Sequence, residues 1–159
     1  MINDSLLILL ADSDENDRAF FKDALLEIKV KTDLKLANNG SQLMKYLDNP
    51  ENRLPDIVFM DLNMPVLSGM KCLIEIRRKK RLRDLAIAIY STSSSEVNIE
   101  EAFVQGANIY IKKPDDFLVL KMVLEHVLTI NWQYHTSGLK KENFLLNINT
   151  IGTDEGSKT

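Results

Sequence analysis

Oxygen-rich side chains and one lysine stand directly after short apolar runs of this 159-residue sequence. In chain order they are Asp12, Ser13 and Asp14, then Asp61, then Ser91, and finally Lys113. Carboxylates together with carbonyl oxygens make the hard, oxygen-rich site that Mg²⁺ prefers. A carboxylate can also act as a nucleophile and carry phosphate as an acyl phosphate, while a lysine and a hydroxyl hold the phosphoryl oxygens. The set predicts phosphoryl chemistry with a divalent cation, provided that the fold brings these residues together.

The apolar runs that precede these residues have the pattern of β-strands. They cover residues 6–11, 33–37, 56–60, 86–90 and 108–112. The first, third and fourth runs are nearly continuous in apolar residues, which is typical of strands buried on both faces of a parallel sheet. The second run alternates between apolar and polar residues, as an edge strand does.

Amphipathic helical patterns lie between the strands. In the first of them, apolar residues have i, i+3, i+4, i+7 spacing at Phe21, Ala24, Leu25 and Ile28. Asp14 is a good N-cap for this helix, with Asp17 at the N3 position. Ser41 is expected to begin the second helix, and Gly106 to end the fourth as its C′ residue.

Five strand–helix units predict a doubly wound α/β domain with right-handed crossovers and helices on both faces of the sheet. We assign residues 1–131 to this domain and residues 132–159 to a C-terminal tail. The last eight residues of the tail have the composition of a disordered segment. Apolar residues of the tail that could dock on the domain surface are Phe144, Leu145, Leu146 and Ile148.

Composition narrows the class of protein. The net charge of −3 gives no global reason to expect nucleic acid or an acidic membrane as a partner. The chain has a single cysteine, Cys72, which excludes an intrachain disulfide and fits a cytoplasmic location. The basic stretch "RRKKRLR" (residues 77–83) admits a nucleic-acid interpretation, but cations also suit the negative end of a helix dipole, and we favour that interpretation.

In open α/β sheets, ligands bind beyond the carboxyl ends of the strands, where the polar residues of this sequence collect. The motifs "ILLADSDENDR", "DIVFMDLNMPVLSG", "IYSTSS" and "GANIYIKKP" occur in this order over residues 5–130. Together they resemble the receiver domain of two-component response regulators, of the single-domain, chemotaxis-regulator-like type. The resemblance implies a flavodoxin-like, five-stranded sheet in the order 2-1-3-4-5.

The same resemblance implies roles for individual residues. Asp61 would accept a phosphoryl group from a histidine kinase or a phosphotransfer protein, with Lys113 pairing with that group. The metal site would comprise Asp12, Asp61 and the backbone carbonyl of Asn63. Ser91 would take the position of the switch hydroxyl and Tyr110 that of the switch aromatic residue, with the Lys113–Pro114 peptide in the cis form.

One position departs from the family pattern. The family usually has two adjacent acids after the first strand. In this sequence the two positions hold Asp12 and Ser13, so the second acid is replaced by a neutral residue. At an effective dielectric near 20, unit charges about 4 Å apart interact by roughly 4 kcal/mol before desolvation offsets it. We therefore expect weak Mg²⁺ binding and slow or conditional phosphorylation. Ser13 could be a ligand or a neutral turn residue, and Asp14 could enter the pocket or only cap the helix.

The leading hypothesis is a stand-alone receiver without enzymatic activity, a monomer or weak dimer that signals through a downstream protein target. The alternative is a pseudo-receiver, a binding module in which Ser13 impairs Mg²⁺ binding and phosphorylation. A phosphatase or a flavin protein is disfavoured, because residues 61–63 read "DLN" without a second acid and no Gly-rich loop follows the first strand. No membrane association is expected, since no stretch approaches the ~20 apolar residues of a transmembrane helix.

Overall fold

The computed structural model describes residues 5–130 and 144–146 of the chain. The strands are β1 (Leu6–Ala11), β2 (Thr32–Ala37), β3 (Ile57–Met60), β4 (Ile87–Ser91), β5 (Ile109–Lys112) and β6 (Leu145–Leu146). The helices are α1 (Glu15–Glu27), α2 (Gly40–Asp48), α3 (Gly69–Arg78), α4 (Glu96–Val104) and α5 (Phe117–Leu128). In this part of the chain, no helix is long and apolar enough to cross a membrane.

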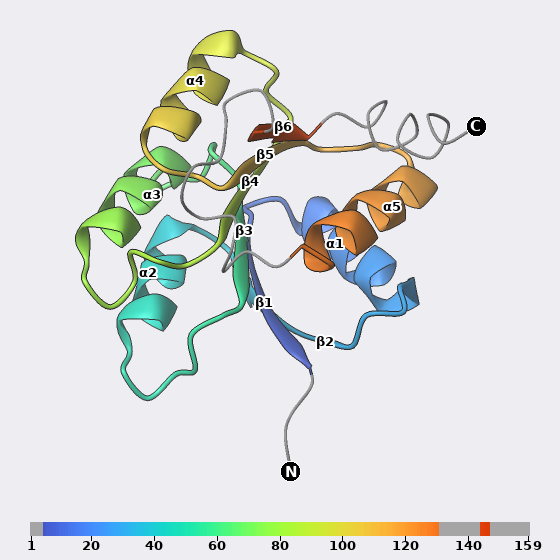
Figure 1. Ribbon diagram of the computed structural model, residues 1–159, viewed down its shortest axis with the longest axis horizontal. Helices are drawn as coiled ribbons and strands as arrows, with labels where there is room; N and C mark the ends of the chain where they lie inside the picture. Colours follow the sequence, from blue (N-terminus) through green and yellow to red (C-terminus); the bar gives the residue numbers. More distant parts are fainter. Residues whose placement is uncertain (1–4, 131–143, 147–159) are drawn as a thin grey trace.

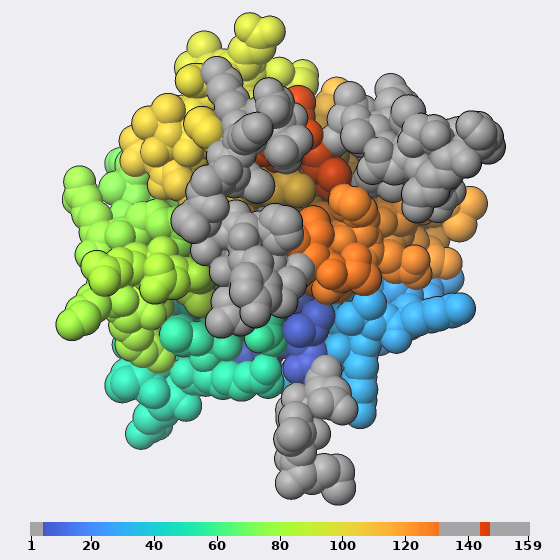
Figure 2. Space-filling model, viewed as in Figure 1, coloured from blue at the N-terminus to red at the C-terminus, as the bar shows by residue number. Residues whose placement is uncertain are grey.

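The strands form one parallel sheet in the order β2-β1-β3-β4-β5-β6, which confirms the predicted order of the first five. The two-residue strand β6 extends the sheet beyond β5 and was not predicted. Helices α1 and α5 cover one face of the sheet, and α2, α3 and α4 cover the other (Figure 1). In Figure 2, β6 (red) lies at the surface with α4 (yellow) on one side and α5 (orange) on the other.

Burial along the strands explains their sequence patterns. Every residue of β3 and β4 is buried, as is β1 from its second residue onward, whereas most residues of β2 keep some solvent exposure. The core divides into two clusters, one under α2, α3 and α4 and the other under α1 and α5. In the second cluster the rings of Phe21, Phe59 and Tyr90 stack edge to face, just below the ends of the strands that carry the polar residues. Such interdigitated aromatic packing fixes the positions of the strands beneath the site.

The helix termini agree with the sequence in most cases. Asp14 caps α1 by accepting a hydrogen bond from the backbone N–H of Asp17 (2.9 Å), and Gly106 follows α4 with a φ of 96°, as expected for C′. The predicted start of α2 at Ser41 was wrong. Asn39 caps that helix instead, because its side chain accepts from the N–H of Gln42 at 2.8 Å.

Two further expectations concern the Lys113–Pro114 peptide and the C-terminal tail. All peptide bonds within the described residues are trans, so the expected cis Lys113–Pro114 peptide was wrong. The trans form of an X–Pro bond is favoured by about 0.5–1 kcal/mol unless contacts select cis, and Lys113 reaches its partners from the trans peptide. The last eight residues and Ile148 of the predicted tail lie outside the described residues.

Candidate functional site

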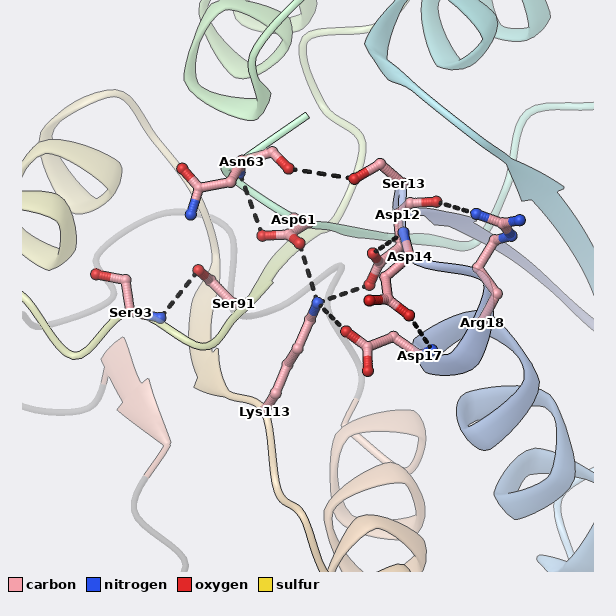
Figure 3. Close-up of polar contacts among 10 residues, drawn as sticks. All are labelled: Asp12, Ser13, Asp14, Asp17, Arg18, Asp61, Asn63, Ser91, Ser93 and Lys113. Atoms are coloured by element: carbon pink, nitrogen blue, oxygen red, sulfur yellow. Dashed lines mark hydrogen bonds and ion pairs between the residues drawn. The ribbon is translucent and has the colours of Figure 1, made fainter. Parts of the chain in front are cut away.

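The carboxyl ends of β1, β3 and β5 bring together three of the predicted site residues. Strands β1 and β3 are neighbours with Ala11 paired to Met60, so Asp12 and Asp61, the next residue on each strand, lie side by side. The N–H of Asp61 donates to the Ala11 carbonyl oxygen at 3.0 Å, which holds the two strand ends together. Lys113 follows β5, and its long side chain spans β4 to reach both acids (Figure 3).

The Lys113 ammonium is surrounded by carboxylates. Its Nζ lies 2.8 Å from Oδ2 of Asp12, 2.9 Å from Oδ2 of Asp61 and 2.8 Å from Oδ2 of Asp17. The Lys113 side chain is only 7% exposed. Burial by itself lowers the pKa of Lys113, but the attraction of the three carboxylates around its ammonium outweighs burial and raises that pKa above its usual value. Lys113 therefore stays a cation throughout the physiological pH range.

Asp17 is the site residue that the sequence analysis missed. It stands at N3 of α1, where a role in the helix cap already explained an acid at this position. In the structure, the first turn of α1 projects the Asp17 side chain toward Lys113 (Figure 3). The signal was the spacing of Asp14 and Asp17, one turn apart at the carboxyl end of β1, which places a second acid over the same edge of the sheet.

Asp12 is the most buried acid of the site. Its side chain is 0% exposed, and its Oδ1 accepts a hydrogen bond from the backbone N–H of Asp14 at 3.0 Å. Arg18 donates to the Asp12 backbone carbonyl at 2.8 Å, which fixes the loop after β1. Burial raises the pKa of Asp12, and the nearby Asp61 charge adds to this, while Lys113 and the Asp14 N–H act in the opposite direction. The charged form of Asp12 therefore carries a cost in stability.

The residues expected around a metal ion lie on this same edge. The Ser13 hydroxyl faces the backbone oxygen of Asn63 at 3.5 Å, and the Asn63 N–H donates to Oδ1 of Asp61 at 3.2 Å. Asp14 uses its carboxylate as the α1 cap. Two loops, one after β1 and one after β3, thus face each other across the Asp12–Asp61 pair.

The donor set suits a hard cation such as Mg²⁺. Oδ2 of Asp12 is buried and accepts no hydrogen bond in the described structure, although it lies in ion-pair contact with Lys113. Such an oxygen gains from a cation, and carboxylate, carbonyl and hydroxyl oxygens are the ligands that Mg²⁺ takes. Within residues 5–130 and 144–146, no group of three His, Cys, Asp or Glu has the arrangement of a metal site. Carbonyl or hydroxyl oxygens, together with water, would complete the coordination of Mg²⁺.

The predicted switch residues lie on β4 and β5. Ser91 ends β4, is fully buried, and its hydroxyl oxygen accepts the N–H of Ser93 at 3.2 Å. Tyr110 of β5 is also fully buried, and its hydroxyl donates to the backbone oxygen of Ser93 at 2.9 Å. The loop after β4 therefore connects the two predicted switch positions through Ser93.

The loop after Asp61 is tight and strained. A Cβ at Gly69 would lie 2.1 Å from the backbone oxygen of Asp61, so only glycine allows α3 to begin this close to the site. Val66 has a φ of 71° and centres a γ-turn in which the Leu67 N–H donates to the Pro65 oxygen at 2.8 Å. A positive φ is unfavourable for a β-branched residue, so this turn holds strain next to the site.

The basic stretch 77–83 has structural partners. Arg77 donates to the backbone oxygens of Gly106, Arg83 and Leu85 and to Oδ1 of Asn108. Burial lowers the pKa of the Arg77 guanidinium, while Asp84 acts in the opposite direction. These contacts tie the end of α3 to the start of β4 and β5, which supports the structural interpretation of this stretch.

Comparison with known proteins decides the family. The family model of the "Response regulator receiver domain" matches residues 8–125, which is most of the chain. The chain belongs to the response regulator receiver family. Receiver domains are signalling modules of two-component systems, and the resemblance expected from the sequence motifs is thereby confirmed.

Curated relatives of this receiver include regulators from archaea and bacteria. The "Probable methanogenesis regulatory protein FilR2" of Methanothrix harundinacea is 27% identical over 127 residues, which cover 78% of this chain and 82% of the relative. The "Chemotaxis protein CheY1" of Helicobacter pylori is 28% identical over 124 residues, which cover 78% of this chain and 98% of the relative.

Solved receiver structures have the same fold. The Mn²⁺-bound response regulator Rcp1 superimposes with a TM-score of 0.73 at 21% identity, covering 79% of this chain and 97% of that one. The phosphorylated cyanobacterial phytochrome response regulator RcpA also gives a TM-score of 0.73, at 26% identity, covering 79% of this chain and 95% of that one. The flavodoxin-like receiver fold predicted from the sequence is confirmed.

Proposed function

We propose that this receiver accepts a phosphoryl group on Asp61 from a histidine kinase or a phosphotransfer protein, and signals through a downstream protein target. The observation that carries the proposal is the Lys113 ammonium, which bridges Asp12 and Asp61 at 2.8 and 2.9 Å in a largely buried position. A buried, permanent cation beside a strand-end carboxylate is suited to hold the charge of a phosphoryl group.

The transfer requires a nucleophile, a leaving group and a cation that stabilises the charge of the phosphoryl oxygens. A carboxylate oxygen of Asp61 attacks the phosphorus of the donor phosphohistidine, forming a P–O bond while the P–N bond breaks and its electron pair stays on the imidazole nitrogen. Lys113, which is shared among three carboxylates before transfer, then pairs with the new phosphoryl oxygens. The Ser91 hydroxyl, at the end of the adjacent strand β4, is the second group that we assign to these oxygens.

Mg²⁺ would be held by Asp12, Asp61 and the Asn63 carbonyl, with Ser13 or Asp14 as the variable position. When bound, the ion neutralises charge on the phosphoryl oxygens. The Asp14 carboxylate caps α1, and Ser13 is neutral. The metal site therefore has fewer carboxylates than the family pattern. We assign part of the missing charge to Asp17, whose carboxylate offsets the Lys113 ammonium from outside the Asp12–Asp61 pair.

The signal would pass from the site to the surface through β4 and β5. Phosphoryl contacts of Ser91 would pull on the loop that also holds Tyr110, since both contact Ser93. The expected partner surface is the α4–β5–α5 face around Tyr110. A stand-alone chain, a cytoplasmic location, a monomer or weak dimer, and the absence of enzymatic activity stay predictions.

A pseudo-receiver is the second candidate function, and Ser13 favours it. In this form the domain would bind partners without phosphotransfer, because the metal would bind too weakly. A Mg²⁺ titration separates the candidates: saturable binding by the wild type supports phosphotransfer. Binding that appears only in Ser13→Asp supports the pseudo-receiver.

Intact-mass spectrometry tests the leading function. Incubation of the full chain with acetyl phosphate and Mg²⁺, or with a phosphorylated kinase, should add one phosphoryl group. The Asp61→Ala variant should gain none. A wild type that gains no phosphoryl group from any of these donors would refute the proposal.

A further inference from the structure

The described C-terminal residues lie against β5, the strand that carries Tyr110. Strand β6 pairs with Tyr110 and Ile111 in a parallel ladder. Phe144, just before β6, is fully buried, and its ring meets the rings of Tyr110 and Phe103 edge-on at centroid distances of 6.2 and 5.3 Å. One short segment therefore gives the edge of the sheet both a strand and an aromatic anchor.

The attachment of this segment to the sheet is small. Strand β6 has two residues, at the short end of strand lengths in proteins, and Leu145 is 41% exposed. Leu146 packs only as a partly buried residue against the core under α1 and α5. Phe144 is thus the main apolar contact, and its loss would leave β5 as an open edge beside Phe103 and Tyr110. Exposed strand edges accept further strands from other chains.

The surface beside β6 indicates the chemistry of a partner. A groove between α4 and Leu145 is lined by apolar and acidic residues, namely Glu96, Val97, Ile99, Glu100, Glu101, Val104 and Leu145. Val97 and Val104 are 73% and 66% exposed. In the sequence, the segment that fills the β5 edge is preceded by Lys140, Lys141, Glu142 and Asn143, which together carry one net positive charge. Apolar residues with basic neighbours complement a surface of this composition.

We propose that the β5 edge, together with Phe103 and Tyr110, is a docking site for an extended segment with an aromatic anchor, aliphatic neighbours and flanking basic residues. The chain's own residues 144–146 occupy it in cis, and a partner protein docks by replacing them with a segment of the same kind. This inference rests on the proposed function, in which the receiver signals through a downstream protein, and it defines what that protein must present.

Nuclear magnetic resonance of the isotope-labelled full chain tests the site without any phosphoryl donor. The probe is the synthetic peptide KKENFLLNI, which has the sequence of residues 140–148 and includes both lysines. In the wild type the cis segment competes at an effective concentration on the order of millimolar, so the peptide binds poorly. In Phe144→Ala the peptide should bind at least about tenfold more tightly and shift the amide signals of Phe103, Tyr110 and Ile111.

Matched controls separate docking from general loosening of the fold. Leu26→Ala, which changes an exposed side chain on α1 away from β5, should behave as the wild type, and the peptide KKENALLNI should bind to none of the proteins. If Phe144→Ala does not fold, Phe144→Leu should also bind the peptide more tightly than the wild type does, by a smaller factor. The proposal is overturned if the folded Phe144 variant binds the peptide no better than the wild type, or if KKENALLNI binds equally well. Neither outcome bears on phosphorylation of Asp61.

Discussion

Asp17 and Lys113 form an ion pair of 2.8 Å between the first turn of α1 and the loop after β5. The pair adds a third carboxylate to those of Asp12 and Asp61 around this lysine. The Asp17 side chain is 38% exposed, whereas that of Lys113 is 7% exposed, so Asp17 lies on the solvent side of the buried lysine. The pair makes Asp17 the residue best placed to offset the missing charge at Ser13.

Asp17→Asn should weaken Mg²⁺ binding by several-fold, because the site loses one negative charge while the Lys113 cation remains. A unit charge in water interacts by ~1 kcal/mol with another at about 4 Å, and by twice that with a divalent ion. Glu15→Gln is the matched control, because it removes the same charge from an exposed residue of the first turn of α1. Isothermal titration calorimetry measures both. An equal loss of Mg²⁺ affinity in the two variants would show that Asp17 contributes only through its charge and not through its contact with Lys113.

Ser13→Asp should tighten Mg²⁺ binding by about tenfold or more, since it places a carboxylate opposite the Asn63 carbonyl, where the serine hydroxyl now lies. The acetyl phosphate reaction should accelerate in parallel. Ser13→Asn serves as the control for size and polarity without charge. Unchanged affinity in Ser13→Asp would show that position 13 does not face the metal.

Asp12→Asn should raise the free energy of unfolding of the metal-free protein at pH 7 by about 1 kcal/mol. The raised pKa means that Asp12 binds its proton more tightly in the folded protein than in the unfolded chain. The contribution of Asp12 to stability therefore falls as the pH rises from 3.8, the ordinary pKa of an aspartate, through the raised pKa of the folded state. The difference between variant and wild type should therefore vanish in acid. Urea unfolding across pH measures this, with Asp33→Asn on the exposed edge strand β2 as the control. A variant less stable than the wild type at pH 7 would contradict the account.

Val66→Gly should increase the free energy of unfolding by roughly 1 kcal/mol. The positive φ of Val66 costs about 1–3 kcal/mol, and glycine removes this strain at an entropic cost of ~0.5–1 kcal/mol. Val97→Gly, at an exposed position in helix α4, should instead lose about 0.5 kcal/mol. Thermal and urea denaturation of both variants provide the comparison. Loss of stability in Val66→Gly would mean that the turn is not strained.

Much of the site followed from the sequence because parallel strands end at one edge. Residues Asp12 and Asp61 follow neighbouring buried strands, so their proximity needed only the strand order. The Asp14 cap and the Gly106 terminus were also predictable, because each depends on local backbone chemistry. The predictions of the two helix ends rest on local patterns that one or two residues define.

The rest depended on contacts between distant parts of the chain. Asp17 already had a local role at N3 of α1, and only the position of β5 gives it Lys113 as a partner. Strand β6 is two residues long, which is too short for a periodic pattern. Asn39 and Ser41 are both good N-cap residues, and the sequence does not decide which of them faces the free N–H groups of α2.

The central claim is that Asp61, and no other acid of the site, accepts the phosphoryl group. Borohydride reduces an acyl phosphate at an aspartate to homoserine, so treatment after reaction with acetyl phosphate and Mg²⁺ marks the modified residue. Peptide mass spectrometry of the wild type should place the homoserine at position 61 alone, and Asp61→Asn should give none. Homoserine at Asp12, Asp14 or Asp17, or an unmodified chain after reaction with every donor, would contradict the account.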